Sequence, residues 1–244
     1  MNIIINGAGG RMGKALQVMA GSKAVTVAAA VDPFVTEGGI LPSLESYSGT
    51  ADCILDFSNH AGTKDLCAYG VKKQIPLVIA TTGHTQAELE IIQETAKTVP
   101  VFWSGNFSVG IALLASLARQ TARMFPDADI EIVESHHNQK LDVPSGTALM
   151  LARAIREARP EAEFLVGRHE NGKREKKEIG IHSLRMGNTV GIHEIIVNTG
   201  TQIITLKHEA QDRSLFAEGA LAAAAFLVEQ APGLYGMEDL LKRG

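Results

Sequence analysis

Short apolar runs alternate with amphipathic stretches through the first half of the chain. The apolar runs predict buried strands at Ile3–Ile5, Val25–Val31, Cys53–Phe57, Leu77–Ala80 and Val101–Trp103. Apolar residues at helical spacing predict helices at Gly13–Ala20, Ala61–Lys72 and Gln86–Lys97. This alternation is typical of a parallel sheet with helices on both faces. We therefore expect a Rossmann-type α/β domain that binds its ligand beyond the carboxyl ends of the strands.

The second half of the chain has a different pattern. Strands are predicted at Asp129–Glu134, Ile179–Leu184, Val190–Val197 and Gln202–Lys207, and helices at Val109–Arg123, Ala148–Ala158 and Ser214–Gln230. Asn198-Thr199-Gly200 predicts a hairpin between the last two strands. We expect an α+β domain with a mixed sheet at residues 108–216. It interrupts a first domain made of residues 1–107 and 217–244.

Composition narrows the class of protein. Apolar residues make up 45% of the 244 residues and charged residues 20%, with a net charge of −4. No basic block suggests a nucleic-acid partner or a membrane surface. No apolar run reaches about 18 residues and no signal peptide is evident, so we expect a cytoplasmic protein. The two cysteines, Cys53 and Cys67, are expected to be buried small hydrophobic residues.

A glycine-rich turn links the first predicted strand to the first helix. Its sequence from residue 7 is Gly-Ala-Gly-Gly-Arg-Met-Gly, so the glycines fit the spacing Gly7-x-x-Gly10-x-x-Gly13 better than the usual dinucleotide fingerprint. Glycines there let a diphosphate approach the backbone at the start of a helix. The turn predicts a dinucleotide cofactor, and the alternative is a merely tight turn.

Asp32 ends the second predicted strand. A carboxylate at this position accepts hydrogen bonds from the adenosine ribose and repels a 2′-phosphate. The residues that follow, Pro33 to Val35, carry no positive charge, which favours NADH. Arg11 and Lys14 are close enough in sequence to reach a phosphate, so NADPH stays open. The alternative is that Asp32 simply begins a turn.

Titratable and hydroxyl side chains are most concentrated between Glu134 and Ala148. The sequence there is Glu-Ser-His-His-Asn-Gln-Lys-Leu-Asp-Val-Pro-Ser-Gly-Thr-Ala. Ser145 or Thr147 can cap the helix that follows Pro144, and such a helix start binds anions. Two histidines and a lysine add proton donors nearby. No third ligand completes a zinc site, so no metal is expected. The alternative is a polar loop with a capped helix.

This stretch resembles the signature of dihydrodipicolinate reductases, bacterial enzymes of lysine and diaminopimelate biosynthesis. Three other segments resemble that family as well: Ala80-Thr81-Thr82-Gly83, Ser104-Gly105-Asn106-Phe107-Ser108, and the stretch from Arg185 through Glu194. Three positions depart from the family's pattern. Ala80 replaces a glycine, Ser104 stands where Ala or Thr is common, and Ile192-His193 replaces a Glu-His pair.

The resemblance implies NAD(P)H-dependent reduction of 4-hydroxy-tetrahydrodipicolinate to tetrahydrodipicolinate by a homotetramer, with the substrate and the subunit contacts in the second domain. His136 and Lys140 are the candidate proton donors, and neither is preferred. The substrate carboxylates are expected at His137, Lys140, Ser145, Gly146 and Thr147. The residues expected at the cofactor are Gly7, Ala8, Gly9, Gly10, Arg11, Met12, Asp32, Phe57, Ala80, Thr81, Thr82, Ser104, Gly105, Asn106 and Phe107.

Two other functions fit the same architecture. One is a different Rossmann-type oxidoreductase, such as an amino-acid dehydrogenase, and the other is a nucleotide-sensing module without turnover. The intact set of His136, Lys140 and Ser145–Thr147 argues against both. The segment 168–178, rich in both charge signs, is expected to be a solvated loop, with a mobile cover over the site as the alternative.

Overall fold

The computed structural model describes residues 1–35 and 37–242. Its contacts divide the chain into a first unit, Met1–Ser108 with Ser214–Gly244, and a second unit, Val109–Arg213. Each unit is built from strands and helices around its own apolar core. Within the described residues, no helix has the length and apolar character needed to span a bilayer.

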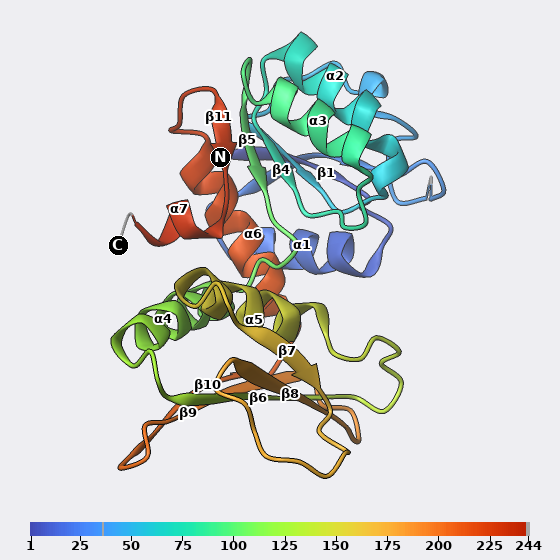
Figure 1. Cartoon of the computed structure of the whole chain (residues 1–244). Coiled ribbons are helices and arrows are strands. Elements are labelled where there is room, and N and C mark those ends of the chain that lie inside the picture. The colour runs from blue at the N-terminus through green and yellow to red at the C-terminus, as the bar shows by residue number, and fades with distance from the viewer. Residues whose placement is uncertain (36, 243–244) are drawn as a thin grey trace. The chain divides into compact units, whose positions relative to one another are not determined.

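The first unit holds a parallel sheet with the strand order β11-β5-β4-β3-β1-β2 (Figure 1). The strands are β1 (Asn2–Asn6), β2 (Thr26–Val31), β3 (Cys53–Asp56), β4 (Leu77–Ile79), β5 (Pro100–Trp103) and β11 (Gly233–Tyr235). Ile3, Ile4 and Ile5 are all fully buried, as a strand covered on both faces requires. The Rossmann-type prediction is confirmed.

Helices cover both faces of this sheet. The helices of the first unit are α1 (Arg11–Gly21), α2 (Thr63–Lys73), α3 (Gln86–Thr95), α6 (Ser214–Leu227) and α7 (Met237–Leu241), with short 3-10 turns η1 (Leu44–Ser46) and η2 (His60–Gly62). Figure 1 shows α2 and α3 on one face, and α1 and α6 on the other. α1 begins two residues earlier than predicted, because the helix starts directly after the Gly10 cap.

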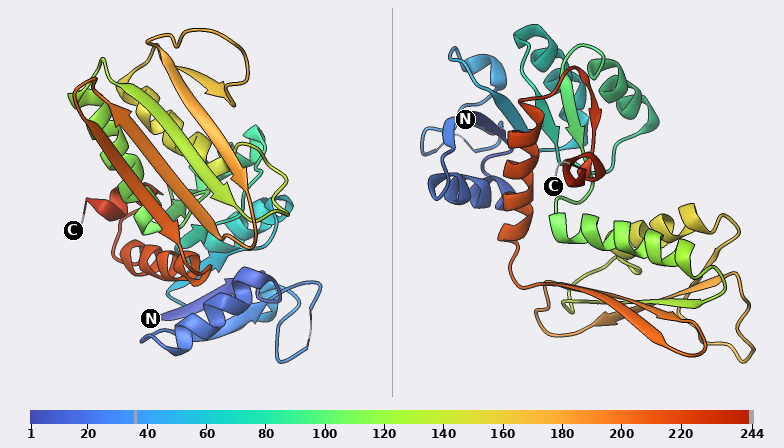
Figure 2. Two further views of the ribbon diagram at one scale, coloured as in Figure 1. Left: turned by 90° about the horizontal axis from the view of Figure 1, so that it is seen from below. Right: turned by 90° about the vertical axis from the view of Figure 1, so that its left-hand side faces the viewer.

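The second unit is a mixed sheet with two helices on one face (Figure 2). Its elements are α4 (Val109–Met124), β6 (Asp129–His136), α5 (Gly146–Ala158), β7 (Glu163–Val166), β8 (Glu178–Arg185), β9 (Gly191–Asn198) and β10 (Ile203–Ala210). The strand order is β10-β9-β6-β8-β7, and β6 runs parallel to β8 but antiparallel to β9. The prediction of an α+β unit with a mixed sheet is confirmed.

Smaller sequence predictions can also be compared with the structure. The hairpin is confirmed, with the Asn198 side chain accepting a hydrogen bond from the Gly200 N–H. Both cysteines are buried and neither forms a disulfide, as expected. Residues 168–177 form neither helix nor strand, and Arg174 ties this loop to the sheet through Glu131 and the Ile130 carbonyl.

Strand β6 begins in the apolar core and ends in a cluster of polar side chains. Alternate residues of a strand share a face, and Ile130, Ile132, Glu134 and His136 all occupy buried positions on this strand. The first two belong to the apolar core under α4 and α5. The last two continue the same face beyond it, so this end of β6 is a buried polar site.

Candidate active site

The glycine turn of the first unit is shaped by steric necessity. Gly7 has a φ of +83°, and a Cβ there would lie 2.6 Å from the Phe57 carbonyl oxygen. A Cβ on Gly13 would collide with the Gly7 carbonyl oxygen. Glycine is therefore required at positions 7 and 13, which matches the spacing identified in the sequence.

The start of α1 is suited to an anion. Gly10 caps the helix without any side-chain hydrogen bond, and the first turn contains no acidic residue. The first helical bond runs from Lys14 N to the Gly10 carbonyl, so the N–H groups of Arg11, Met12 and Gly13 have no acceptor within the helix and can bind a ligand. Such a helix end attracts a phosphate through its dipole and its N–H donors.

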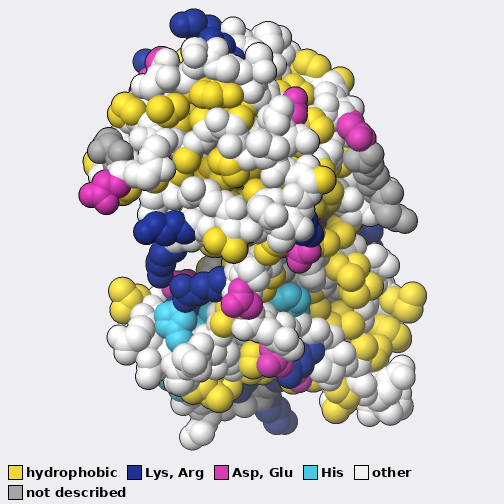
Figure 3. Space-filling view, turned by 180° about the vertical axis from the view of Figure 1, so that it is seen from behind, with side chains coloured by type: hydrophobic (Ala, Val, Ile, Leu, Met, Phe, Trp, Pro, Cys, Tyr) yellow, Lys and Arg dark blue, Asp and Glu magenta, His cyan; other side chains and the backbone are white. Residues whose placement is uncertain are grey.

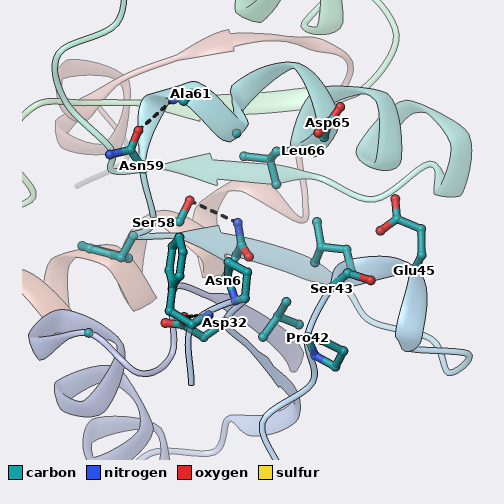
Figure 4. A pocket seen from close by; sticks show the side chains of 18 residues that line it. Asn6, Asp32, Pro42, Ser43, Glu45, Ser58, Asn59, Ala61, Asp65 and Leu66 are labelled. Carbon is teal, nitrogen blue, oxygen red and sulfur yellow. Dashed lines mark hydrogen bonds between the residues drawn. The ribbon is translucent and has the colours of Figure 1, made fainter. Parts of the chain in front are cut away.

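A cavity of about 780 Å³ lies beside this turn (Figure 4). Asp32 lines it and is 8% exposed. Its two carboxylate oxygens accept hydrogen bonds from Gly9 N at 3.0 Å and Phe34 N at 2.9 Å, which fixes the carboxylate and leaves lone pairs for a ribose. Glu45 and Asp65 also line the cavity, so its charged lining is acidic.

A second cavity of about 390 Å³ lies at the other side of the turn. Its lining comes from the start of α1 and from the ends of β3 and β4: Gly10, Arg11, Met12, Phe57, Ser58, Asn59, His60, Ala80, Thr81 and Thr82. The two cavities together collect most of the predicted cofactor residues, and their size and donors fit a dinucleotide. Ala8 and Gly9 line neither cavity. Ala8 is fully buried, and the Gly9 N–H donates a hydrogen bond to the Asp32 carboxylate.

The predicted segment Ser104–Phe107 also lies outside both linings. It forms a turn in which Ser104 Oγ accepts from Asn106 N, and Asn106 Oδ1 accepts from Ser108 N. Phe107 is buried against Phe57 and Phe102. Phe107 therefore packs against Phe57, which lines both cavities, and the cofactor contact expected for Ser104–Phe107 stays a prediction.

The pattern in the sequence gave no reason to single out Asp56, yet it joins three strand ends. This carboxylate is 2% exposed. It accepts hydrogen bonds from Asn6 Nδ2 at 2.7 Å, Ser58 Oγ at 2.6 Å and Thr81 Oγ1 at 2.6 Å. Three donors stabilise a buried charge. Asp56 therefore holds β1, β3 and β4 in register at the edge where both cavities open.

In the second unit, Glu134 forms the centre of the polar site. It is fully buried, and Arg185 donates to both of its oxygens at 2.8 and 2.9 Å. His136 Nδ1 lies 2.5 Å from Oε2, and Ser145 N donates to Oε1 at 3.1 Å. Glu134 thereby connects the end of β6, the end of β8 and the start of α5.

The charge of Glu134 determines the tautomer of His136. Burial alone would raise the pKa of Glu134, but the hydrogen bonds from His136 and Arg185 outweigh it and hold that pKa well below its usual range. An ionised carboxylate only accepts hydrogen bonds, so His136 Nδ1 must carry a proton. The other ring nitrogen, Nε2, is left to exchange a proton with a ligand.

His193 packs against His136 from β9. The two ring centroids lie 5.1 Å apart, edge to face, and His193 Nε2 lies 3.3 Å from Ser145 Oγ. Burial, reinforced by the neighbouring His136, lowers the pKa of His193 to about 4. His193 is therefore neutral near pH 7. A Cβ on Gly191 would lie 3.1 Å from His136 Nε2, so glycine leaves that atom accessible.

Three of the predicted substrate residues, Ser145, Gly146 and Thr147, form the start of α5. Ser145 Oγ caps the helix by accepting from Ala148 N, as the sequence suggested. No atom would lie within 4 Å of a Cβ on Gly146, so the space in front of the helix is open. His137 and Thr147 are half-buried. Figure 3 shows one face of the molecule, on which histidine side chains reach the surface near basic and acidic ones.

Lys140 is held by a neighbouring carboxylate. Its Nζ lies 2.7 Å from Asp142 Oδ1, and its side chain is 22% exposed. The Lys140 ammonium lowers the pKa of Asp142, and the Gly146 backbone N–H adds to this effect. Lys140 therefore reaches the start of α5 as a positively charged donor.

In the second unit, sequence reasoning missed three residues as functional groups: Arg185, Gly191 and His193. They lie in the segment that carried the family resemblance, but the pattern did not show what they touch. His193 is opposite Glu134 in the β6–β9 register, and Arg185 is opposite His136 in the β6–β8 register. Within residues 1–35 and 37–242, no three His, Cys, Asp or Glu side chains are grouped to hold a metal ion.

Comparison with known proteins connects both units to one family. The family model described as dihydrodipicolinate reductase, N-terminus, matches residues 1–107, and the one described as dihydrodipicolinate reductase, C-terminus, matches residues 110–241. The chain belongs to the dihydrodipicolinate reductase family. The resemblance noted in the sequence is thereby confirmed, together with the prediction of an NAD(P)H-dependent oxidoreductase.

Individual relatives agree with the family assignment. The 4-hydroxy-tetrahydrodipicolinate reductase of Caldanaerobacter subterraneus subsp. tengcongensis is 43% identical over 100% of this chain and 99% of the relative. The enzyme of that name from Clostridium tetani is 40% identical over 99% of this chain and 97% of its own length. The chain thus matches these reductases along nearly their whole length.

Solved structures separate the family from the wider fold. A dihydrodipicolinate reductase from Paenisporosarcina sp. TG-14 with dipicolinate bound has a TM-score of 0.84 at 26% identity, covering 98% of both chains. An aspartate dehydrogenase from Thermotoga maritima has a TM-score of 0.51 at 13% identity, covering 95% of this chain and 97% of that one, and shares only the fold. The amino-acid dehydrogenase alternative therefore has fold-level support alone.

Proposed function

We propose that this chain reduces 4-hydroxy-tetrahydrodipicolinate to tetrahydrodipicolinate with a reduced nicotinamide cofactor. The observation that carries the proposal is the hydrogen-bonded series Arg185–Glu134–His136 beside Lys140 at the open start of α5. This arrangement offers a proton donor, a fixed positive charge and a helix N-terminus in one place. Reduction of a cyclic imine dicarboxylate can use all three: the donor for protonation, and the charge and the helix start for the carboxylates.

His136 is proposed as one proton donor. Glu134 holds its Nδ1 in the donor role, so a protonated His136 presents Nε2–H to a ligand. The neighbouring carboxylate stabilises the imidazolium until its proton leaves. After transfer, the neutral ring keeps its Nδ1–H on Glu134 and needs no reorientation.

Lys140 is proposed as the second donor or as the charge that stabilises the reduced ring. Its ammonium is paired with Asp142 in this structure. A substrate carboxylate can replace Asp142 as the partner, because both are carboxylates within reach of the same Nζ. The ammonium then favours negative charge that develops in the substrate.

The substrate carboxylates are proposed to bind at His137, Lys140 and the start of α5, Ser145–Thr147. The dipicolinate named in the Paenisporosarcina structure is a planar dicarboxylate. A helix start with an open approach at Gly146 is suited to such an anion.

The cofactor is proposed to bind in the first unit along the two cavities. It supplies the hydride when bound. Asp32 would hold the adenosine ribose, and the start of α1 would hold the diphosphate. The acidic lining at Asp32, Glu45 and Asp65 favours NADH over NADPH. The substrate-binding role of the second unit, the homotetramer and the cytoplasmic location stay predictions.

A coupled assay tests the proposed function. A synthase generates the unstable substrate in the cuvette, and the oxidation of NADH and of NADPH is followed in parallel. Rapid oxidation that depends on the synthase supports the proposal, and the ratio of the two rates gives the cofactor preference. No oxidation of either cofactor, with the synthase shown to be active, would favour the nucleotide-sensing alternative.

A further inference from the structure

The second cavity contains a histidine that the proposed function does not use. Two of its lining residues can carry positive charge, Arg11 and His60. Arg11 belongs to the first turn of α1, where a diphosphate is expected. His60 belongs to η2, just after the end of β3, and reaches the same cavity from another element.

Glu88 fixes the His60 ring. His60 Nδ1 lies 3.0 Å from both carboxylate oxygens of Glu88. The same carboxylate accepts from Thr85 N at 2.6 Å and from Thr85 Oγ1 at 3.0 Å, as part of a capping box at the start of α3. These bonds, the Thr85 backbone N–H first, lower the pKa of Glu88 to about 2. Glu88 is therefore ionised at any pH at which the enzyme would be assayed.

An ionised Glu88 leaves one role for each nitrogen of His60. Nδ1 must carry a proton, because a carboxylate only accepts. Nε2 is then the ring atom available to a ligand in the cavity. A neutral His60 would offer only an acceptor there, whereas a protonated His60 offers a charged donor.

We propose that His60 is a cofactor-binding residue whose Nε2–H donates to the diphosphate, with Glu88 as its positioning residue. This inference rests on the proposed function, because it assumes that a dinucleotide occupies the second cavity. The diphosphate is the anionic part of that cofactor, and the cavity begins at the α1 turn that attracts an anion. His60 on η2 and Arg11 on α1 would then contact the same diphosphate from two different elements.

The proposal couples cofactor binding to protonation. The other titratable or charged groups around His60 are Glu88 on α3, His84 in the loop after β4, Arg11 on α1 and Asp56 at the end of β3. Burial lowers the pKa of His84, so it is neutral near pH 7. A diphosphate bound in the cavity would add negative charge next to the ring, between His60 and Arg11. Binding is expected to draw a proton onto His60.

Calorimetric titration of the full-length enzyme with ADP-ribose tests this proposal. ADP-ribose carries the diphosphate without the nicotinamide, and AMP serves as a ligand without a diphosphate. Titrations at about pH 7.5 are repeated in buffers of different ionisation enthalpy to count the protons taken up on binding. For His60→Asn we expect about tenfold weaker binding of ADP-ribose and NADH, the scale of one hydrogen bond to a charged group. Proton uptake should fall, and AMP affinity should stay within about twofold.

Two further variants sharpen the test. Glu88→Gln retains an acceptor for Nδ1 but removes the charge, so it should reduce proton uptake more than affinity. His182→Asn is the matched control, because His182 also contacts a glutamate, Glu131 at 2.8 Å, but on the second unit. It should bind all three ligands normally.

The outcomes separate this inference from the proposed function. If His60→Asn binds ADP-ribose with the affinity and the proton uptake of the wild-type enzyme, the inference is overturned and the proposed function stands. A wild-type enzyme that binds neither NADH nor ADP-ribose would overturn the proposed function, and the inference with it.

Discussion

His136 Nδ1 lies 2.5 Å from Oε2 of Glu134, a carboxylate with no exposed surface. A buried charge of this kind is tolerated only when it is paired and hydrogen-bonded, and Arg185 supplies the opposite charge through two further bonds. The imidazole is thus oriented by a group that the solvent cannot reach. The arrangement makes Glu134 a positioning residue for a proton donor.

Glu134→Gln should lower kcat by about ten- to a hundredfold, while KM changes much less. A glutamine can donate to Nδ1, which puts the only proton of the neutral His136 ring on Nε2 and removes the carboxylate that stabilises the imidazolium. A neutral ring is a poor acid, because it would have to leave as an imidazolate. The loss should therefore appear in turnover, which steady-state kinetics in the coupled assay measures. A drop confined to KM would contradict the positioning role.

Glu131→Gln is the matched control for that variant. Glu131 lies on the same strand but contacts His182 and Arg174 in place of His136. Its kcat should stay within about twofold of the wild type. An equal loss in both variants would mean that any carboxylate removed from β6 disturbs the enzyme, and the specific role of Glu134 would fail.

Lys140→Ala should reduce turnover by at least about a hundredfold, the scale typical of lost acid–base catalysis. Lys140 is the charged group at the open start of α5, where its ammonium pairs with Asp142. The coupled assay at saturating cofactor measures the effect. Turnover near that of the wild type would remove Lys140 from the mechanism.

Lys140→Arg distinguishes the two roles proposed for this residue. Arginine keeps the positive charge but does not release a proton near neutral pH. If Lys140 only stabilises charge, Lys140→Arg should recover a substantial part of the turnover lost in Lys140→Ala. If Lys140 donates the proton, the two variants should be similarly slow.

The fold was largely predictable because its strands follow simple rules. The continuous apolar run Ile3–Ile5 predicts a strand buried on both faces, and the structure buries it completely. Strands β7 (Glu163–Val166) and β11 (Gly233–Tyr235) were missed. Both are edge strands without a buried residue, whereas the equally short β4 is buried throughout and was predicted from its apolar run.

The site was predictable where its residues are neighbours in sequence. His136, Lys140 and Ser145 lie in one short stretch, whereas Arg185 and His193 reach Glu134 only through the registers of β8 and β9. The Ile192-His193 departure is resolved in the same way. His193 lies opposite Glu134 on the buried face, so Ile192 belongs to the other face of the sheet and does not alter the site.

NADH should bind at least as tightly as NADPH, because Asp32, Glu45 and Asp65 would repel a 2′-phosphate. The Glu45→Gln/Asp65→Asn double variant should move the ratio of the two dissociation constants toward NADPH by a few-fold. Both side chains are exposed, so added salt should weaken their effect. Calorimetric titration with each cofactor measures the ratio.

The control for cofactor preference is Glu94→Gln. This exposed carboxylate on α3 pairs with Lys97 and lines neither cavity. Its ratio of NADH to NADPH affinity should equal that of the wild type. A strong NADPH preference in the wild-type enzyme would refute the electrostatic argument, whatever the variants do.

His193 should make the stability of the enzyme depend on pH. Its pKa is about 4 in the folded chain, mainly because it is buried, and about 6.5 when unfolded. The folded form therefore binds fewer protons between those values. The stabilising contribution of the neutral ring is complete above about pH 6.5 and is lost as the pH falls toward 4.

Urea unfolding at pH 7 and pH 5 measures this loss. From the two pKa values, the free energy of unfolding should fall by about 2 kcal/mol between these pH values through His193 alone. His193→Gln cannot titrate, so its own decrease over the same interval should be smaller by about that amount, even though it starts from a lower stability. His169→Gln, which removes an exposed histidine with 80% of its side chain in solvent, should keep the full wild-type decrease. If His193→Gln lost as much stability as the wild type, the buried neutral state of His193 would be wrong, and the protonated ring would have to find a partner near Ser145 and His136.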